Sequence, residues 1–345
     1  MQVSDFSFEL PPELIAQYPR TDHENDRLLV IDRNTGEYQD KMFRDFPSFL
    51  HKGDVLVLND TKVRKSRLFA TNENGGKVEV LFLHPVSSDL SLWNVITNHS
   101  KRRKVGEKLV FEDGTVSYIK EFLDDGIKVL EFKSPITEKF FENIGHIPLP
   151  PYIKREDELS DEKTYQTIYS KNIGSSASPT SGLHFTKEIL KEIEEKGVEV
   201  LYITLHVGMG TFMPMHSQVL EEHKMHSEYF EVSEEVAARI NAAKREGRRI
   251  VASGTTVMRT LESVWDENTK SVVPQKGNTD IFIYPGFTFC VCDELLTNFH
   301  TPESTLFALV CAFSSMDIAK TAYKHAVSEK YRFFSYGDAT FFKIS

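Results

Sequence analysis

The sequence is poor in cysteine. Cys290, Cys292 and Cys311 are its three cysteines, and an odd number with a one-residue gap fits alternate faces of a strand better than a disulfide or a zinc-binding pair. Free cysteine is among the residue types most often buried. We therefore expect three reduced, structural thiols.

Long hydrophobic runs and a signal peptide are also missing. No apolar run approaches the roughly 20 residues that span a membrane. The first ten residues carry acids where a signal peptide needs a basic region. We expect a cytoplasmic protein without a membrane partner.

Positive charge is in deficit, with 41 Lys and Arg against 51 Asp and Glu and a formal net charge of −10. Because nucleic-acid backbones attract clustered Lys and Arg, this balance argues against a protein that coats nucleic acid. Short basic runs nevertheless occur at residues 62–67, 101–104 and 244–249. Each run by itself indicates a solvated face, but two runs near a domain junction are compatible with a groove for a phosphate backbone.

Several common motifs are absent. The stretch "GMGTFMP" is not G-x-G-x-x-G, and neither a P-loop nor G-x-S-x-G occurs, so a dinucleotide fingerprint, a P-loop and a nucleophile elbow are unsupported. His216, His223 and His226 have a spacing that could suggest a metal, but no H-E-x-x-H motif accompanies them. We expect no metal, and hydrogen bonding to a polar ligand is the simpler role for His226.

What is present is the pattern of a large α/β fold. With 40% hydrophobic residues, the 345-residue chain can bury a large core. Two strands are expected within residues 26–43, and an apolar strand within 53–60. From about residue 186, helices alternate with strands, including a strand expected at 279–286, which indicates a mixed, largely parallel sheet with helices on both faces. Thr186 and Ser233 are placed as helix caps, and Gly197 and Gly247 as helix ends.

Residues 67–132 differ from the rest of the chain. Short alternating runs are separated there by Gly-Gly, Asp-Gly and charged turns, a pattern typical of a small antiparallel barrel or sandwich. The segment therefore looks like a domain inserted into the first one.

Polar residues gather where the expected strands end. In α/β sheets the carboxyl ends of the strands carry the ligand site. Each polar stretch also has a purely structural explanation. Helix capping explains Ser253–Thr256 as well as a ligand site does, an Asx turn explains Asn59–Thr61, and His206 could be a core histidine. Asn298, His300 and Asp338 need partners if they are buried, so they form either a hydrogen-bonded lattice or a site, and their number favours a site. The polar strand ends are Asn59-Asp60-Thr61, His206-Val-Gly208-Met-Gly210-Thr211, Ser253-Gly-Thr-Thr256 and Tyr284-Pro-Gly286.

Six motifs together resemble one family. In this order they are "LVLNDTKV", "PTSGLHFT", "TLHVGMGTF", "HKMHSE", "TNFHTPESTL" and "YRFFSYGDA". They resemble the S-adenosylmethionine:tRNA ribosyltransferase-isomerases of queuosine synthesis, over about Phe6 to Phe342. The resemblance implies a large α/β catalytic domain, here residues 1–66 and 150–345, interrupted by an inserted β-barrel domain, residues 67–149.

The resemblance also implies a reaction. The ribosyl part of S-adenosylmethionine moves onto 7-aminomethyl-7-deazaguanine at the tRNA wobble position and is isomerised, which gives epoxyqueuosine and releases adenine and methionine. S-Adenosylmethionine is consumed as a substrate, so no separate cofactor is expected. The partners are this substrate and the tRNA, and the absence of a long exposed apolar stripe favours a monomer.

The chemistry needs proton transfers, and histidine suits them near neutral pH. We expect His184, His206 and His300 to act as acids or bases, with Asp60 and Asp338 orienting them or binding the ribose hydroxyls. The expected substrate-binding residues are Asn59, Thr61, Thr180, Gly208, Gly210, Thr211, His226, Glu228, Asn298 and Tyr336. The expected tRNA-binding residues are Lys62, Arg64, Lys101, Arg102 and Arg103.

Two other interpretations stay open. An S-adenosylmethionine-dependent RNA methyltransferase would use the same substrate, but no strand opening the α/β region ends in the glycine-rich loop of such enzymes. A non-catalytic RNA-binding protein would explain the basic runs, but would leave the polar strand ends without a purpose.

Overall fold

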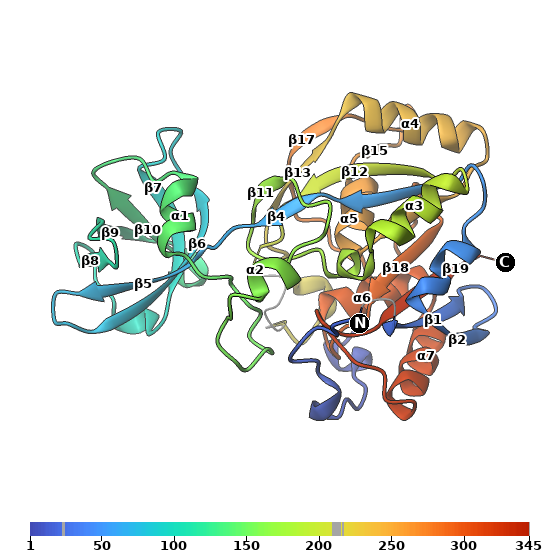
Figure 1. The fold of residues 1–345 in the computed structure, drawn as a ribbon, viewed down its shortest axis with the longest axis horizontal. Helices are drawn as coiled ribbons and strands as arrows, with labels where there is room; N and C mark the ends of the chain where they lie inside the picture. The colour runs from blue at the N-terminus through green and yellow to red at the C-terminus, as the bar shows by residue number, and fades with distance from the viewer. Residues whose placement is uncertain (23–24, 209–214, 216, 345) are drawn as a thin grey trace.

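The computed structural model describes residues 1–22, 25–208, 215 and 217–344. A large α/β body and a smaller β body lie side by side, and the chain passes from one to the other through β4 (Figure 1). Both termini lie on the large body, so the small one is formed by an internal segment.

A nine-stranded sheet forms the centre of the large body. The strands β12, β3, β14 and β18 run parallel at its middle, and β19 is antiparallel to β18 but parallel to β1. The expected mixed sheet is therefore confirmed, with its parallel part concentrated at the centre. In spatial order the strands are β17 (Gln275–Thr279), β13 (Glu228–Val232), β12 (Glu199–Leu205), β3 (Val55–Asn59), β14 (Ile250–Ser253), β18 (Glu294–Asn298), β19 (Ala339–Lys343), β1 (Arg27–Asp32) and β2 (Tyr38–Met42).

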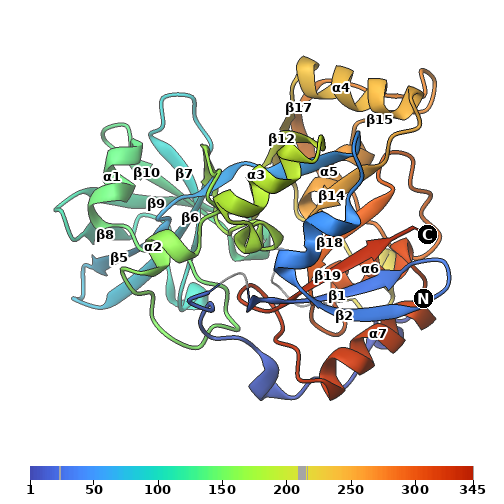
Figure 2. The same cartoon turned by 45° about the vertical axis from the view of Figure 1, so that its right-hand side comes forward.

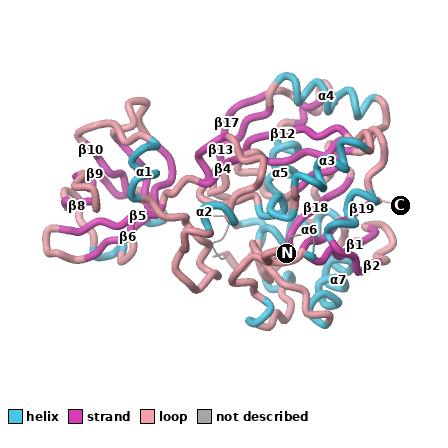
Figure 3. The backbone as a smooth tube through the Cα atoms, viewed as in Figure 1, coloured by secondary structure: helices cyan, strands magenta, loops and turns pink. Residues whose placement is uncertain are grey.

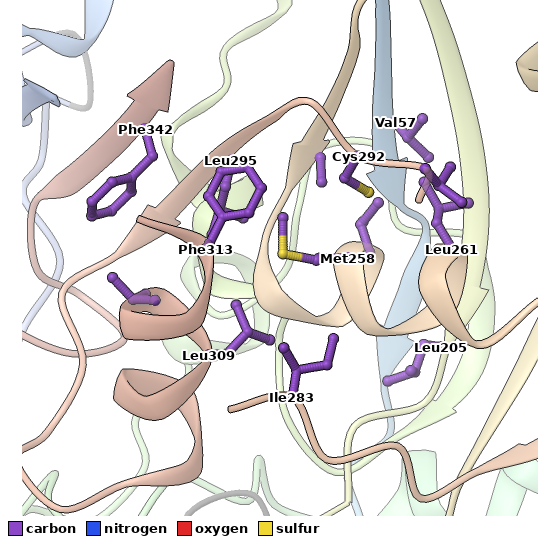
Figure 4. Close-up of a cluster of buried hydrophobic side chains, with 14 of the residues drawn as sticks. Val57, Leu205, Met258, Leu261, Ile283, Cys292, Leu295, Leu309, Phe313 and Phe342 are labelled. Carbon is purple, nitrogen blue, oxygen red and sulfur yellow. The ribbon is translucent and has the colours of Figure 1, made fainter. Parts of the chain in front are cut away.

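Helices cover both faces of this sheet, as expected. Side chains alternate along β3, so that Val55 and Val57 join one core while Leu56 and Leu58 join the other. Figure 4 shows part of the first core, where Met258 and Leu309 pack beneath the sheet. The first core is covered by α4 (Glu234–Arg245), α5 (Thr255–Ser263), α6 (Thr305–Phe313) and α7 (Met316–Ser328), and the second by α3 (Lys187–Glu195) and the 3-10 helix Phe43–Phe49.

The expected helix caps are confirmed. The Thr186 hydroxyl accepts the backbone N–H of Ile189 at 3.2 Å, and the Ser233 hydroxyl accepts that of Val236 at 3.3 Å. Gly197 and Gly247, just beyond the helix ends, have φ angles of 84° and 69°, which glycine adopts without a steric penalty.

The small body is a closed antiparallel barrel, so the barrel alternative is confirmed and the sandwich is not. Closure comes from the pairing of β10 with β9. The helix α1 (Glu138–Ile144) lies beside the barrel strands (Figure 3). Its Phe140 and Phe141 side chains belong to the barrel core. In spatial order its strands are β10 (Lys128–Phe132), β7 (Leu92–Thr97), β6 (Lys77–Pro85), β5 (Arg67–Asn72), β8 (Lys108–Phe111) and β9 (Val116–Phe122).

Short elements surround the junction of the two bodies. The strand β4 (Thr61–Val63) leads from β3 to the barrel and pairs in parallel with β11 (Asn172–Ser175) (Figure 1). Figure 2 shows the same two bodies turned by 45°. The helix α2 (Asp161–Thr164) follows the return of the chain, and β15 (Trp265–Asp266) with β16 (Ser271–Val272) forms a small hairpin after α5.

One expected strand is wrong. The strand β17 ends at Thr279, and residues 280–293 form no strand, so the cysteines at 290 and 292 lie in a loop. Long-range side-chain contacts are the reason. Within the expected strand, Arg259 Nε donates to the Ile281 carbonyl at 3.2 Å. In the cysteine loop, the Glu262 carboxylate accepts the backbone N–H groups of Cys290, Val291 and Cys292 at 2.8, 3.1 and 2.9 Å. These bonds replace a strand ladder. All three cysteines are free thiols.

In the described residues no single helix is long and apolar enough to cross a membrane. The pair α6 and α7 meets that test together by length and composition, but the two helices are bent by 116° at their break.

A buried charged cluster holds the amino-terminal edge of the parallel strands. Arg249 binds Asp54 and, through Nη1, the Glu294 carboxylate at 2.7 Å. Burial raises the pKa of Glu294 to about 7, although the Arg249 charge opposes this shift. The folded protein therefore keeps a proton on Glu294 at pH values where the unfolded chain has lost it.

Between pH 4.5 and 7, the folded state binds more protons than the unfolded state at this position, so the free energy of unfolding should fall as pH rises. The slope contributed by one group is at most about 1.4 kcal/mol per pH unit. We expect Glu294→Gln to remove this contribution, measured by urea unfolding at several pH values. The exposed Glu112→Gln should leave the wild-type slope unchanged, and an unchanged slope in Glu294→Gln would contradict the assignment.

Candidate active site

A cavity of about 560 Å³ lies at the carboxyl ends of β14 and β18. This is the edge of an α/β sheet at which ligands bind, and the volume is typical of a small-molecule site. Its walls come from segments far apart in the sequence. They are Pro151–Tyr152, Ser178–Ser181, Gly254–Thr256, Thr297–Ser304 and Phe334–Ser335, with Val3, Val207, Met215 and Leu306.

His300 lies on the wall of this cavity in a neutral form. Its Nε2 is 3.0 Å from the Thr297 hydroxyl, and its backbone N–H donates to the Tyr323 hydroxyl at 3.2 Å. Burial lowers the pKa of His300 to about 3. At neutral pH the ring is therefore an uncharged imidazole that can take part in hydrogen bonds.

Two buried polar atoms on the cavity wall have no hydrogen-bond partner among the described residues. The Asn298 amide nitrogen donates to the Phe334 carbonyl at 3.0 Å, which leaves its Oδ1 unpaired. The Ser178 hydroxyl is unpaired too. Leaving a buried polar atom unpaired costs about 1–3 kcal/mol, so this pair indicates a polar ligand.

An aromatic wall adjoins these atoms. The rings of Tyr152 and Phe334 stack with centroids 4.4 Å apart at 24°, and the Tyr152 hydroxyl is 2.5 Å from that of Ser335. Both rings line the cavity. Flat apolar faces beside polar acceptors suit a heterocycle with amino groups.

The side chains of Asn59 and Asp60, at the end of β3, form their hydrogen bonds with other groups of the protein. Asn59 Oδ1 accepts the backbone N–H groups of Thr61 and Leu205 at 3.1 and 3.0 Å, and its amide nitrogen donates to the Leu205 carbonyl at 3.0 Å. Asp60 accepts the Thr204 hydroxyl at 2.6 Å and the Asn172 amide at 3.1 Å. Neither residue lines the cavity.

His206 lies beside the β4–β11 pair, also off the cavity wall. Its Nδ1 is 2.7 Å from the Thr61 hydroxyl, and its ring stacks on Tyr229 with centroids 5.6 Å apart. Burial lowers the pKa of His206 to about 4, the Arg64 charge acts in the same direction, and the charges of Asp60 and Glu231 oppose it.

Other expected substrate-binding residues lie off the cavity wall or outside the described chain. The Gly208 backbone N–H donates to Glu228 at 2.9 Å, and Glu228 forms a buried ion pair with Arg259. His226 is partly buried. Gly210 and Thr211 lie outside the described residues.

Three further expected residues lie behind the cavity. His184 Nδ1 is 2.7 Å from Asp26 Oδ2. Asp338 accepts the backbone N–H groups of Arg27 and Arg332 at 2.9 and 2.7 Å, and the Tyr336 hydroxyl donates to Asp161 at 2.9 Å. Thus Thr180, Asn298 and His300 lie on the cavity, while the roles expected for all these residues stay predictions.

The expected tRNA-binding cations differ in exposure. Lys101 and Arg102 are exposed on a turn of the barrel, and Lys62 is partly exposed on β4. Arg103 is bonded to Glu107 at 2.9 Å. Only 11% of the Arg64 side chain is exposed, because its Nε donates to Glu138 of the barrel at 3.0 Å.

Sequence reasoning missed Tyr152, Ser178, Ser335 and Asp26. Ser178 stands at the start of the quoted stretch "SPTSGLHFT", but a serine before a proline indicates a turn as readily as a ligand contact. Nothing in their spacing shows that these residues meet, because the contacts span up to 183 positions.

Among the described residues, no group of three or more His, Cys, Asp or Glu side chains is placed so as to hold a metal ion.

Comparison with known proteins identifies the family. A family model described as "Queuosine biosynthesis protein" matches residues 3–342. The chain belongs to this family. The S-adenosylmethionine:tRNA ribosyltransferase-isomerase of Treponema denticola is 46% identical over 343 residues, covering 98% of this chain and 99% of the relative. That of Acetivibrio thermocellus is 48% identical over 346 residues, covering 99% and 100%.

A solved structure agrees. The crystal structure of the S-adenosylmethionine tRNA ribosyltransferase from Thermotoga maritima is 33% identical, covers 98% of this chain and 100% of that one, and gives a TM-score of 0.56. The comparisons confirm the expected family, fold and transferase-isomerase activity in queuosine biosynthesis, and they favour it over a methyltransferase or a non-catalytic RNA-binding protein.

The position of His206 depends on the absence of a side chain at Gly174. A Cβ atom there would lie 2.5 Å from His206 Nε2. We expect Gly174→Ala to displace the imidazole from Thr61, to destabilise the protein by about 1–3 kcal/mol, and to move the pKa of His206 upward as the ring becomes more exposed.

An NMR titration of the histidine ring together with denaturant unfolding would measure both effects. Gly277→Ala, whose Cβ would meet its nearest neighbour at 3.7 Å, is the matched control in a strand. A variant histidine that still titrates near the wild-type value would refute the steric account.

Proposed function

We propose that the cavity binds S-adenosylmethionine and that the enzyme transfers and isomerises its ribosyl part onto 7-aminomethyl-7-deazaguanine at the tRNA wobble position. Epoxyqueuosine-tRNA forms, and adenine and methionine are released. The observation that carries the site assignment is the pair of unpaired buried atoms, Asn298 Oδ1 and Ser178 Oγ, on a cavity at the carboxyl ends of the central strands.

The ligand chemistry fits this wall. Asn298 Oδ1 can only accept, so it needs an N–H or O–H donor, and S-adenosylmethionine carries such groups on its adenine, ribose and amino acid parts. The stacked Tyr152 and Phe334 rings offer an apolar face for a purine, and aromatic faces attract cations such as the sulfonium.

We assign His300 to hydrogen bonding with the substrate in its neutral form. A base whose pKa is about 3 is a poor final acceptor of a proton at neutral pH, and a bound sulfonium would lower that pKa further. Thr180 and Asn298 share the cavity wall with His300 and serve as its neighbouring binding groups.

We place the tRNA on the barrel side. His206, Thr61 and Tyr229 lie next to the β4–β11 pair, where the chain passes to the barrel (Figure 1). Lys101 and Arg102 are the exposed cations of the barrel turn Ser100–Arg102, and they serve to contact phosphates.

We also propose that no separate cofactor or metal takes part and that the enzyme works as a monomer in the cytoplasm. The support for the first point is chemical. The sulfonium already carries the leaving group and acidifies the neighbouring C5′ hydrogen, so the substrate supplies the activation that a cofactor would provide.

Incubation of the protein with S-adenosylmethionine and tRNA carrying 7-aminomethyl-7-deazaguanine should release adenine and methionine and give the mass of epoxyqueuosine. Ser178→Ala and Asn298→Ala should weaken binding of S-adenosylmethionine about tenfold, because each removes a partner of the bound ligand. Isothermal titration, with and without tRNA, measures the binding.

Asn241→Ala is the control, since the Asn241 side chain is bonded to the Val272 backbone away from the cavity. Tight tRNA binding without adenine release would refute the activity. Unchanged affinity for S-adenosylmethionine in both cavity variants would refute the site.

The double change Lys101→Ala/Arg102→Ala should lower tRNA affinity and reduce the slope of log K against log salt by about 1.5–2, as expected for two lost phosphate contacts. Filter binding at several salt concentrations gives the slope. Lys133→Ala/Lys139→Ala removes two other exposed lysines next to the barrel strands and serves as the control. Equal slopes in the wild type and the first variant would exclude the turn as a tRNA contact.

A further inference from the structure

His184 and Asp26 form a buried pair behind the cavity. The distance from His184 Nδ1 to Asp26 Oδ2 is 2.7 Å, and the two residues are 2% and 3% exposed. The imidazole also stacks on Phe43, with ring centroids 4.9 Å apart. The other ring nitrogen, His184 Nε2, is buried without a hydrogen-bond partner among the described residues.

The pairing decides which nitrogen carries the proton. An ionised carboxylate accepts hydrogen bonds and donates none, so the proton of the neutral ring lies on Nδ1, where it faces Asp26. Nε2 then presents a lone pair. A buried lone pair held in place by a carboxylate is the arrangement of a proton acceptor.

His184 borders a small void. A void of about 10 Å³ is lined by Asp26, His184 and Ser335, together with Pro19, Arg20, Leu183, Tyr336 and Gly337. That volume is close to the smallest that holds one water molecule, and such a water needs several polar partners. His184 Nε2 and the Ser335 hydroxyl are candidates for two of them.

Ser335 connects the void with the large cavity. It lines both spaces, and its hydroxyl is 2.5 Å from that of Tyr152, which lies on the cavity wall. Burial raises the pKa of Tyr152 well above its usual value, so this phenol does not retain a negative charge. It can still pass a proton onward when it receives one.

We propose that Asp26 and His184 are the final acceptor of a proton removed from the substrate, reached through Tyr152, Ser335 and one water molecule in the void. The inference rests on the proposed binding of S-adenosylmethionine in the large cavity. In this proposal, His184 with Asp26 is the final proton acceptor, a role for which neutral His300 is unsuited.

The relay transfers one proton from the substrate to His184 and transfers no electron. The Tyr152 oxygen takes a proton from the bound substrate as its own proton passes to Ser335, the Ser335 proton passes to the water, and a water proton passes to His184 Nε2. An imidazolium beside an ionised Asp26 results, and the substrate keeps the electron pair of the broken bond.

The charges around the pair accommodate this state. Asp338 is held by two backbone N–H groups, and Arg20 lies between the two carboxylates, 3.4 Å from each. A positive charge on His184 would be compensated by the Asp26 carboxylate, whose Oδ2 is 2.7 Å from Nδ1. The titratable and charged groups that face the pair are Arg20, Arg332, Tyr336 and Asp338.

The variant His184→Gln tests the relay, since glutamine can accept a hydrogen bond but cannot take the proton. We expect single-turnover adenine release with modified tRNA to fall about 100-fold or more, while the Kd for S-adenosylmethionine changes less than threefold.

A second Asp–His pair provides the matched control. His325 Nε2 is 2.9 Å from Asp40 and lines neither space, so His325→Gln should keep the wild-type rate. A rate for His184→Gln within twofold of wild type would overturn the relay.

The tautomer gives a readout that needs no variant. In ¹⁵N NMR spectra of the wild-type protein at neutral pH, we expect His184 to show a protonated Nδ1 and an unprotonated Nε2. A proton on Nε2 would overturn the proposal.

The two proposals fail separately. If Ser178→Ala and Asn298→Ala leave the affinity for S-adenosylmethionine unchanged, the site assignment fails, and the relay that rests on it fails too. If those variants weaken binding but His184→Gln turns over like the wild type, the relay alone fails.

Discussion

The side-chain amide of Asn59 is the interaction on which the cavity depends. At the end of β3 the backbone ladder stops, and this amide continues it by bonding both the N–H and the carbonyl of Leu205 in β12. It also donates to the Thr256 hydroxyl at 3.3 Å, which fixes the turn from β14 into α5. One side chain thus holds two strand ends and one wall of the cavity together.

The polar residues near this edge divide into two groups by their partners. Asn59, Asp60 and Asp338 have their oxygens engaged by backbone or side-chain donors, so they hold the scaffold. Ser178 Oγ, Asn298 Oδ1 and His184 Nε2 are buried and unpaired among the described residues, so they are the groups with hydrogen-bonding capacity left for a ligand or a water. The cost of an unpaired buried atom is what makes this division informative about function.

Arginine–carboxylate ion pairs connect the large body with the barrel. Arg64 binds Glu138 of α1, and Arg67 binds both Glu79 of the barrel and Asp157 of the returning chain. Both arginines belong to the basic run at residues 62–67, and Arg64 is one of the expected tRNA-binding residues. Their carboxylate partners leave the exposed Lys101 and Arg102 as the more available cations.

The sequence by itself determined the elements, the insertion and the family. The alternation of β3, the caps Thr186 and Ser233 and the barrel strands all follow from local pattern, because the forces that set them act between neighbours. The end of β17 and the loop at Cys290 were not predictable, since Glu262 shapes that loop from 28 positions away. Of the candidate site, Thr180, Asn298 and His300 could be chosen from strand-end composition. Which polar atoms are paired and which stay free was decided by tertiary structure alone, because hydrogen-bond partners such as Tyr152 and Ser335 meet only when distant segments pack together.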